Sequence, residues 1–187
     1  MIIYYFSFFL NFILSKSEKL IFVQTFCRHG ARSPIKLLDG GRDSLGIKWN
    51  DDGDLTPIGK RMEYLLGVFN RHRYITGNYK FLSKKYDPHE LVVFSSDKDR
   101  TLLSITSQLQ GLYPMSEGMG EELNPKQLET SFPPFNITCE EVEKELKVLN
   151  NSALPNNMTI IPIHYINFEN NTRECTAKME ILEMIII

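Results

Sequence analysis

Near its start the chain reads Phe22-Val-Gln-Thr-Phe-Cys-Arg-His-Gly-Ala-Arg-Ser-Pro34, an apolar run that turns abruptly into a cationic loop. Residues 20–26 are mostly apolar and β-prone, which predicts a first core strand. Gly30 can adopt backbone angles that are closed to other residues, so the chain can fold tightly against a ligand there. Pro34 fixes its own φ and pushes Ser33 towards extended geometry, which ends the loop.

The charges of this loop suggest a phosphate site. Arg28 and Arg32 carry planar, permanently charged guanidinium groups that match the oxygens of a phosphate. His29 lies between them and is a candidate covalent nucleophile towards phosphorus. The alternative is a surface loop with a chance basic cluster. The position of the cluster, directly after a strand-like run, favours the phosphate site.

A second strand-to-helix turn carries another arginine. The apolar run Leu91–Phe94 predicts a short strand, and residues 95–104 read Ser-Ser-Asp-Lys-Asp-Arg-Thr-Leu-Leu-Ser. Ser96 or Asp97 can cap the following helix, whose N-terminus favours anions. Arg100 falls in the first turn of that helix and can reach the same ligand. The alternative is an exposed arginine paired with a neighbouring aspartate.

A helix is predicted between these two elements. Thr56 is a good N-cap residue, and Pro57 suits the first helical position. His72 lies among like charges at the far end and is expected to be a solvated capping group. The apolar residues of this helix recur at helical spacing and predict a buried face: Ile58, Met62, Leu65, Leu66 and Phe69.

Four segments together resemble the histidine acid phosphatases, a branch of the phosphoglycerate-mutase-like superfamily. They are Arg-His-Gly-x-Arg-x-Pro at 28–34, Leu-Thr-x-x-Gly at 55–59, Ser-x-Asp-x-Asp-Arg-Thr at 95–101 and Ile-Pro-x-His at 161–164. The resemblance covers roughly residues 20 to 176, the N-terminal half of a typical member. It implies an α/β fold with a mainly parallel central sheet flanked by helices, and the motif loop at the carboxyl edge of the first strand.

The resemblance also implies the chemistry, which is hydrolysis of phosphate monoesters through a phosphohistidine, without metal or other cofactor. His29 is the implied nucleophile, and Arg28, Arg32 and Arg100 are the implied ligands of the phosphate oxygens. The implied substrate is a small-molecule phosphomonoester or a phosphoprotein. His164 either faces the mouth of the site or has a structural role.

The family's downstream His-Asp pair, whose aspartate protonates the leaving oxygen, has no counterpart in this sequence, because none of its four histidines precedes an aspartate. We therefore expect residues 18–187 to form a partial domain that lacks its C-terminal half. The chain is then expected to be a truncated product, a partial gene model or a diverged member of the family. A phosphate-binding protein without turnover and a non-functional fragment are the alternatives. Glu90, Asp97 and Asp99 are the first acids to test as a substitute donor.

The N-terminal segment and four sequons indicate export. Residues 1–17 begin with an apolar run that is too short to span a membrane and predict a signal peptide, although no basic residue precedes Lys16. The alternative is a buried N-terminal strand. The sequons begin at Asn136, Asn150, Asn157 and Asn170. Both features favour a secreted or lysosomal protein.

Composition bounds the remaining possibilities. The 187 residues suit one domain, 42% are hydrophobic, and the net charge of −2 gives no indication of nucleic-acid binding. Of the three cysteines, Cys27 is expected to be buried, whereas Cys139 and Cys175 either pair with each other or have a partner elsewhere. Residues 139–148 predict a solvated helix, residues 160–166 a strand, and the isoleucine-rich end no defined element. The sequence does not indicate an oligomeric state.

Overall fold

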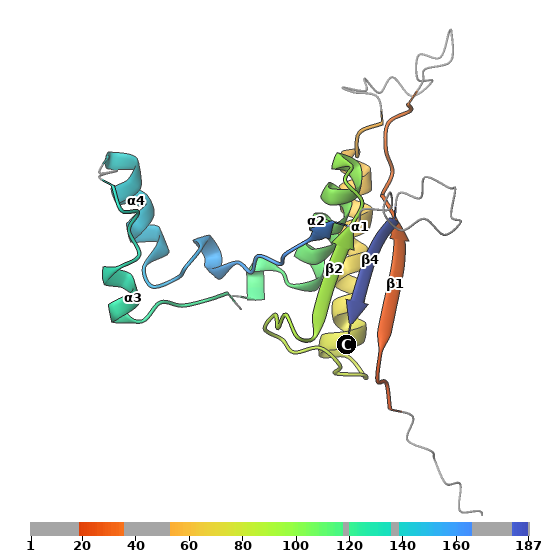
Figure 1. The fold of residues 1–187 in the computed structure, drawn as a ribbon, viewed down its shortest axis with the longest axis horizontal. Coiled ribbons are helices and arrows are strands. Elements are labelled where there is room, and N and C mark those ends of the chain that lie inside the picture. The colour runs from red at the N-terminus through yellow and green to blue at the C-terminus, as the bar shows by residue number, and fades with distance from the viewer. Residues whose placement is uncertain (1–18, 36–52, 118–119, 136–138, 166–180, 187) are drawn as a thin grey trace, which may run out of the picture.

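The computed structural model describes residues 19–35, 53–117, 120–135, 139–165 and 181–186 (Figure 1). The predicted signal segment, the sequons at Asn136 and Asn170, and Cys175 lie outside the described residues. Within the described residues, Cys27 and Cys139 form no disulfide. No helix of the described part has the length and apolar character needed to cross a membrane.

The core of the fold is a four-stranded sheet in the order β1-β4-β2-β3 (Figure 1). The predicted strands are present as β1 (Val23–Arg28), β2 (Leu91–Ser95) and the short β3 (His164–Tyr165). β2 pairs with β3 in parallel, and β1 and β2 both pair antiparallel with β4. The three predicted strands therefore run in one direction, as a mainly parallel α/β sheet requires, and β4 alone among the described strands runs against them.

β4 (Ile181–Ile186) is the strand that the sequence analysis did not anticipate. It occupies the position between β1 and β2 and pairs with both along most of their length. Isoleucine is β-branched and has a high strand propensity. The absence of turn or cap residues in this run says nothing against a strand, because such signals mark the ends of elements and not their type.

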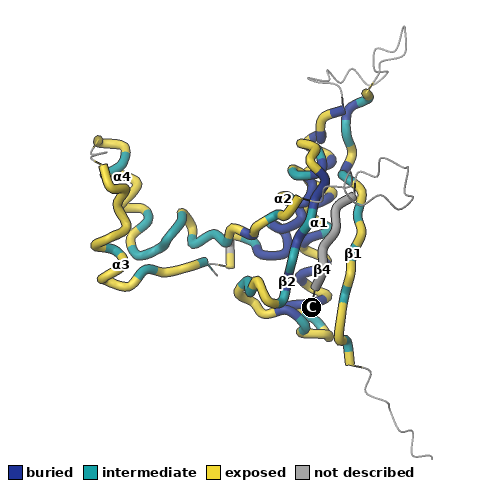
Figure 2. Tube along the Cα trace, in the orientation of Figure 1, coloured by how far each residue is buried: buried dark blue, intermediate teal, exposed yellow. Residues whose placement is uncertain are grey.

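Helices α1 (Pro57–Arg71) and α2 (Asp99–Leu112) lie side by side behind the sheet in Figure 1 and cover one of its faces. The alternate residues Leu91 and Val93 of β2 are fully buried against this layer. Figure 2 shows the buried part of the chain concentrated in β2 and α2. The hydrophobic core cluster consists of Tyr74, Ile75, Leu82, Leu91, Val93, Ile105, Leu109, Leu112, Tyr113 and Ile161.

The face that α1 buries differs from the prediction. Thr56 caps the helix as expected, because its Oγ1 accepts a hydrogen bond from the N–H of Gly59 at 3.0 Å. The buried residues, however, include Gly59, Glu63 and Gly67. The predicted face is largely exposed, with relative exposures of 61%, 55%, 57% and 54% at Ile58, Met62, Leu65 and Phe69.

Glycines explain why α1 packs through this face and not through its apolar face. A β-carbon at Gly67 would collide with the carbonyl oxygen of Gln108 in α2, and one at Gly111 would collide with the carbonyl oxygen of Tyr64 in α1. The two helices therefore approach through their smallest residues, which allows closer backbone packing than the apolar face would. The hydrophobic spacing identified the helix correctly but not its contact face.

The end of α1 is held by Arg71, which is 6% exposed. Its Nη1 donates to the carbonyl oxygen of Leu112 at 3.0 Å, and its Nη2 lies 3.1 Å from a carboxylate oxygen of Glu117. His72 is the exposed C-cap residue, as predicted, and the chain continues as the π-helical turn η1 (His72–Thr76). This end therefore anchors α1 to the end of α2.

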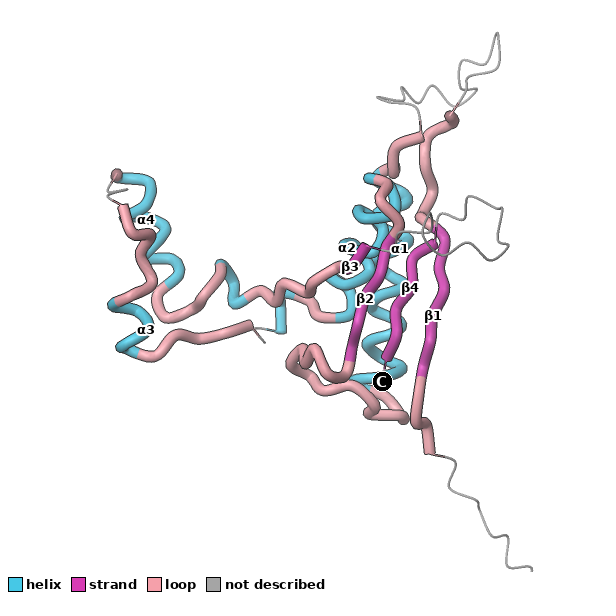
Figure 3. The backbone as a smooth tube through the Cα atoms, viewed as in Figure 1, coloured by secondary structure: helices cyan, strands magenta, loops and turns pink. Residues whose placement is uncertain are grey.

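Short elements lie beyond α2, and Figure 3 shows long loops between them. They comprise η2 (Met115–Glu117), α3 (Pro125–Glu129), α4 (Glu140–Leu149) and η3 (Pro155–Asn157). α4 confirms the helix predicted for residues 139–148. In contrast, the strand predicted for residues 160–166 is reduced to β3 within the described range, and the residues before it have no strand pairing.

Candidate active site

The loop after β1 is supported by the first turn of α1. The backbone N–H and the Oγ1 of Thr56 both donate to the carbonyl oxygen of Ala31, at 3.0 and 2.8 Å. A β-carbon at Gly30 would lie 2.7 Å from the carbonyl oxygen of Gly59. The loop and helix thus approach through two glycines. The Leu-Thr-x-x-Gly segment therefore both starts α1 and positions the motif loop.

The far half of the loop is held by Ser33, which is 3% exposed. Its N–H donates to the carbonyl oxygen of Asp54 at 2.8 Å. Its Oγ accepts hydrogen bonds from the N–H groups of Gly53 and Asp54 at 2.8 and 2.9 Å. Gly53 has a φ of 87°, which favours glycine at this position. These contacts fix the exit of the loop before α1 begins.

The tautomer of His29 follows from its backbone contact. Its Nδ1 lies 2.7 Å from the carbonyl oxygen of Gly30. A carbonyl oxygen can only accept, so Nδ1 must carry the hydrogen and donate. In the neutral imidazole, Nε2 then holds the lone pair, as a nucleophile requires.

A hydrogen-bond chain joins this loop to α2. The N–H of Gly30 donates to Oγ of Ser104 at 3.0 Å, and that hydroxyl donates to the carbonyl oxygen of Arg100 at 2.7 Å. Ser104 is fully buried. The backbone next to His29 and the first turn of α2 are therefore tied together through one buried side chain.

A cavity of about 460 Å³ opens beside the loop. It is lined by residues 28–34 together with Met62 and Glu63 of α1. The structure thus brings Arg28, His29 and Arg32 to one cavity. Nη1 of Arg32 donates to the carbonyl oxygen of Ser33 at 2.8 Å, whereas its buried Nε has no hydrogen-bond partner among the described residues. A buried charged donor without a partner is the arrangement expected beside an anion site.

Arg100, the third predicted phosphate ligand, does not line this cavity. It lies in the first turn of α2, as predicted, but Lys98 is the N-cap residue, and no side chain caps the helix. The expected capping by Ser96 or Asp97 is therefore wrong. Nη1 of Arg100 lies 3.8 Å from the position of a β-carbon at Gly53. Its convergence with the other two arginines on one anion stays a prediction.

Glu63 is the residue of this cavity that the sequence analysis missed. It is 6% exposed, and its Oε2 has no hydrogen-bond partner among the described residues. Burial raises the pKa of its carboxyl group to about 7. One signal in the sequence was available, because Glu63 stands four residues from both Gly59 and Gly67 and so shares the small-residue face of α1.

The acids considered first in the sequence lie elsewhere. Both carboxylate oxygens of Glu90 accept hydrogen bonds from Ser83, at 2.7 Å from its N–H and 2.7 Å from its hydroxyl. Asp97 and Asp99 are exposed and do not line the cavity. The ring of His164 packs against Phe94 of β2, with 5.5 Å between the ring centroids. Like the three acids, His164 is absent from the cavity lining.

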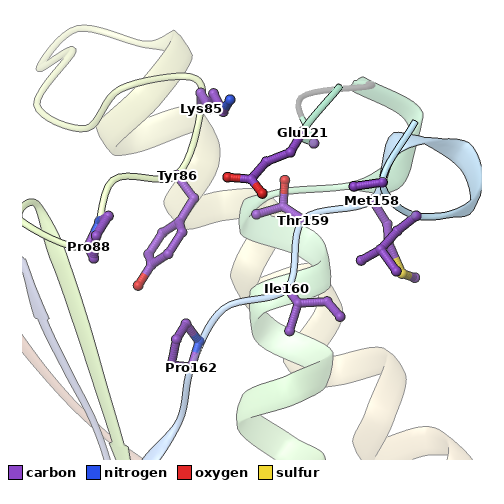
Figure 4. Close-up of a pocket in the computed structure, with 11 residues that line it drawn as sticks. Lys85, Tyr86, Pro88, Glu121, Met158, Thr159, Ile160 and Pro162 are labelled. Carbon is purple, nitrogen blue, oxygen red and sulfur yellow. The ribbon is translucent and has the colours of Figure 1, made fainter. Parts of the chain in front are cut away.

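A second pocket of about 350 Å³ lies between residues 85–88 and the segment 153–162 (Figure 4). Its lining is mostly apolar. The polar side chains that Figure 4 labels are those of Lys85, Tyr86, Glu121 and Thr159. None of the predicted site residues contributes to it. The predicted nucleophile and two of the three predicted arginine ligands therefore line the first cavity and not this pocket.

Comparison with known proteins places the chain in a family. The sequence model of the histidine phosphatase superfamily (branch 2) matches residues 42–183, more than half of the chain. The chain belongs to this superfamily. The family model does not cover residues 28–34, because its match begins at residue 42. The geometry of the His29 loop is therefore evidence that is independent of this match.

Several similar proteins are acid phosphatases by name. Lysosomal acid phosphatase of Xenopus laevis is 38% identical over 101 residues, which cover 54% of this chain and 22% of that protein. Human prostatic acid phosphatase is 37% identical over 115 residues, covering 58% and 28%, respectively. Testicular acid phosphatase of Mus musculus is 35% identical over 121 residues, covering 63% and 26%.

Among solved structures, a Hafnia alvei phytase in complex with tartrate is 29% identical and matches 50% of this chain and 24% of its own, with a TM-score of 0.39. The chain spans about a quarter of the length of the curated relatives that it matches. The shared region is therefore a part of each relative.

Proposed function

We propose that this chain carries the nucleophile and phosphate-binding part of a phosphomonoesterase that works through a phosphohistidine. The observation that carries the proposal is the hydrogen bond from Nδ1 of His29 to the carbonyl oxygen of Gly30, within a cavity that Arg28 and Arg32 also line. It leaves the lone pair on Nε2 of a histidine whose cavity is also lined by two cationic side chains. Membership of the histidine phosphatase superfamily supports a phosphatase.

The first half of the proposed reaction forms a bond between Nε2 of His29 and phosphorus and breaks the bond between phosphorus and the ester oxygen. Arg28 and Arg32 stabilise the charge on the phosphoryl oxygens as the bonds exchange, and Arg100 is the proposed third ligand. The departing oxygen takes a proton from an acid. In the second half, water attacks phosphorus, inorganic phosphate leaves and the imidazole is restored.

The proposed substrates are small-molecule phosphomonoesters or phosphoproteins. The similar proteins are called acid phosphatases, and the names of two of them, lysosomal and prostatic, support a route through the secretory pathway. A leader within residues 1–17 and glycans on the sequons would agree with that route. We accordingly propose a secreted or lysosomal location.

The test is to trap the phosphoenzyme. The chain is mixed with ³²P-labelled phosphomonoester and quenched in alkali, because phosphohistidine is labile in acid. We expect label on the wild type and on the matched control His72→Ala, whose histidine is exposed at the end of α1. We expect none on His29→Ala. Equal label on His29→Ala would refute the assignment.

The trapping experiment, combined with a measurement of phosphate binding, distinguishes the proposed phosphatase from a phosphate-binding protein without turnover. Calorimetric binding of inorganic phosphate, lost in Arg32→Ala, without any labelled histidine would support the binding protein. A chain that neither binds phosphate nor shows cooperative unfolding would support a non-functional fragment.

A further inference from the structure

We propose that Ser104 of α2 is a positioning residue for the reaction of His29. Its hydroxyl fixes the backbone of Gly30, whose carbonyl oxygen holds the imidazole ring. The same hydroxyl ties this backbone to the turn of α2 that carries Arg100. Ser104 is not among the residues that line the cavity, so it acts through these neighbours. The proposal rests on the proposed function, because it assigns a residue that orients the nucleophile of that reaction.

The hydroxyl of Ser104 has one arrangement that satisfies both of its contacts. A serine hydroxyl carries a single hydrogen and can also accept. Its Oγ lies 2.7 Å from the carbonyl oxygen of Arg100, which can only accept, so the hydrogen points there. The N–H of Gly30 lies 3.0 Å from the same Oγ and can only donate, so it meets a lone pair. The contact with Arg100 therefore turns the accepting side of the hydroxyl towards the motif loop.

Two anchors bracket the carbonyl group that holds His29. Before it, the N–H of Gly30 is bound by Ser104. After it, the carbonyl oxygen of Ala31 accepts from the N–H and Oγ1 of Thr56. Between the anchors lies the carbonyl oxygen of Gly30, which accepts from Nδ1 of His29 at 2.7 Å. Glycine has no side chain to restrict its backbone, so the two anchors decide where this carbonyl points. Ser104 thereby helps to set the tautomer that leaves the lone pair on Nε2.

The burial of this contact makes the hydroxyl of Ser104 hard to replace. Ser104 and Gly30 are both buried. A buried N–H without an acceptor is strongly disfavoured, so the loop must shift to find another partner if the hydroxyl is removed. Gly30 already packs closely against the backbone of Gly59, which leaves the loop little room to move towards α1. We therefore expect the shift to turn the carbonyl of Gly30 and release Nδ1 of His29.

Ser104 also couples the nucleophile to the third proposed phosphate ligand. The carbonyl that receives its hydrogen belongs to Arg100, in the first turn of α2. One oxygen atom therefore holds the backbone of Arg100 and the backbone next to His29 at a fixed separation. Transfer of a phosphoryl group needs both the attacking nitrogen and the charges around phosphorus in place at once. A single buried side chain thus sets both.

The first experiment reads the tautomer of His29 by NMR of the chain with ¹⁵N-labelled histidine, at about pH 8, where histidine side chains are ordinarily neutral. The signal of His29 is identified by its loss in His29→Ala. The variants are Ser104→Ala and Ser104→Cys, which keeps a side chain of similar size but offers only a weakly accepting sulfur. The matched control is Ser107→Ala, because Ser107 is partly exposed in the same helix and its hydroxyl also donates to the carbonyl oxygen four residues earlier, at 2.7 Å. We expect the hydrogen on Nδ1 in the wild type and the control, and a mixture of tautomers in both Ser104 variants.

The second experiment measures hydrolysis of p-nitrophenyl phosphate by the same proteins. A displacement of about 1 Å between reacting groups can cost roughly 10²-fold in rate. We expect both Ser104 variants to lower kcat by roughly 10- to 10²-fold with a much smaller change in KM, because the orientation of the nucleophile matters more in the transition state than in the bound ester. The control should match the wild type. Lower stability alone would leave the tautomer and this division between kcat and KM unchanged in the folded chain.

The outcomes distinguish the two proposals. Phosphohistidine on wild-type His29, with an unchanged tautomer and unchanged kcat in Ser104→Ala, would overturn the role of Ser104 and leave the proposed function intact. A wild type that forms no phosphohistidine and hydrolyses no ester would overturn both. Should neither Ser104 variant fold, hydrogen exchange of the Gly30 amide in the wild type decides. We expect strong protection of this amide, and free exchange would overturn the assignment.

Discussion

Replacing Glu63 by Gln should make the stability of this chain less dependent on pH. Burial raises the pKa of Glu63 from its ordinary value of 4.5 to about 7 in the folded protein. Between these two values the folded state binds more protons than the unfolded state, so stability is lost as pH rises. Each pH unit in that interval removes about 1.4 kcal/mol, which gives a total of about 3 kcal/mol by pH 8.

The reason lies in the contacts of the carboxyl group. At low pH it is buried without charge, and at high pH the folded chain must hold a carboxylate whose Oε2 has no hydrogen-bond donor among the described residues. A glutamine at this position also buries polar atoms, but its cost does not change with pH. All other titrating groups are common to both proteins and cancel in the difference.

The assay is urea denaturation of the wild type and Glu63→Gln at several values between pH 4 and 8. The free energy of unfolding of the wild type, relative to the variant, should fall by about 3 kcal/mol between pH 4 and 8. A difference that stays constant over this range would refute the reasoning, because it would mean that folding does not perturb the carboxyl group.

Three further predictions concern other elements. Gly67→Ala places a methyl group against the carbonyl oxygen of Gln108 and should destabilise the chain by about 1–3 kcal/mol, measured by urea denaturation; an unchanged midpoint would contradict the close contact of α1 and α2. Arg100→Ala should lower kcat for aryl phosphate and not merely raise KM, whereas a change in KM alone would exclude it as a transition-state ligand. In secreted material, mass spectrometry should find residues 1–17 removed, and a band shift with N-glycosidase should shrink in Asn150→Gln, because this asparagine is exposed at the end of α4; intact Met1 or an unchanged shift would speak against the export route.

The parts of the fold that the sequence predicted are those with local signals. The apolar runs of β1 and β2 identify strands because they are β-prone and bounded by polar turn residues. Thr56 and Pro57 mark the start of α1 because capping is a local interaction. The cluster of Arg28, His29 and Arg32 was predictable for the same reason, since its residues are nearly adjacent in the chain.

The parts that escaped depend on contacts between distant segments. The orientation of α1 is set by its approach to α2 through Gly67 and Gly111, and apolar spacing cannot reveal that. β4 is placed by pairing with two strands far away in the sequence. Glutamate usually lies on the surface, and Glu63 is buried here because it shares a face of α1 with Gly59 and Gly67.

The central claim is that Nε2 of His29 is the nucleophile, and the position of the phosphoryl group on the imidazole tests it most directly. ³¹P NMR of the alkali-quenched phosphoenzyme distinguishes the two ring nitrogens. The hydrogen bond from Nδ1 to the carbonyl oxygen of Gly30 predicts a phosphoryl group on Nε2 of His29. A phosphoryl group on Nδ1, or on another histidine, would contradict the account.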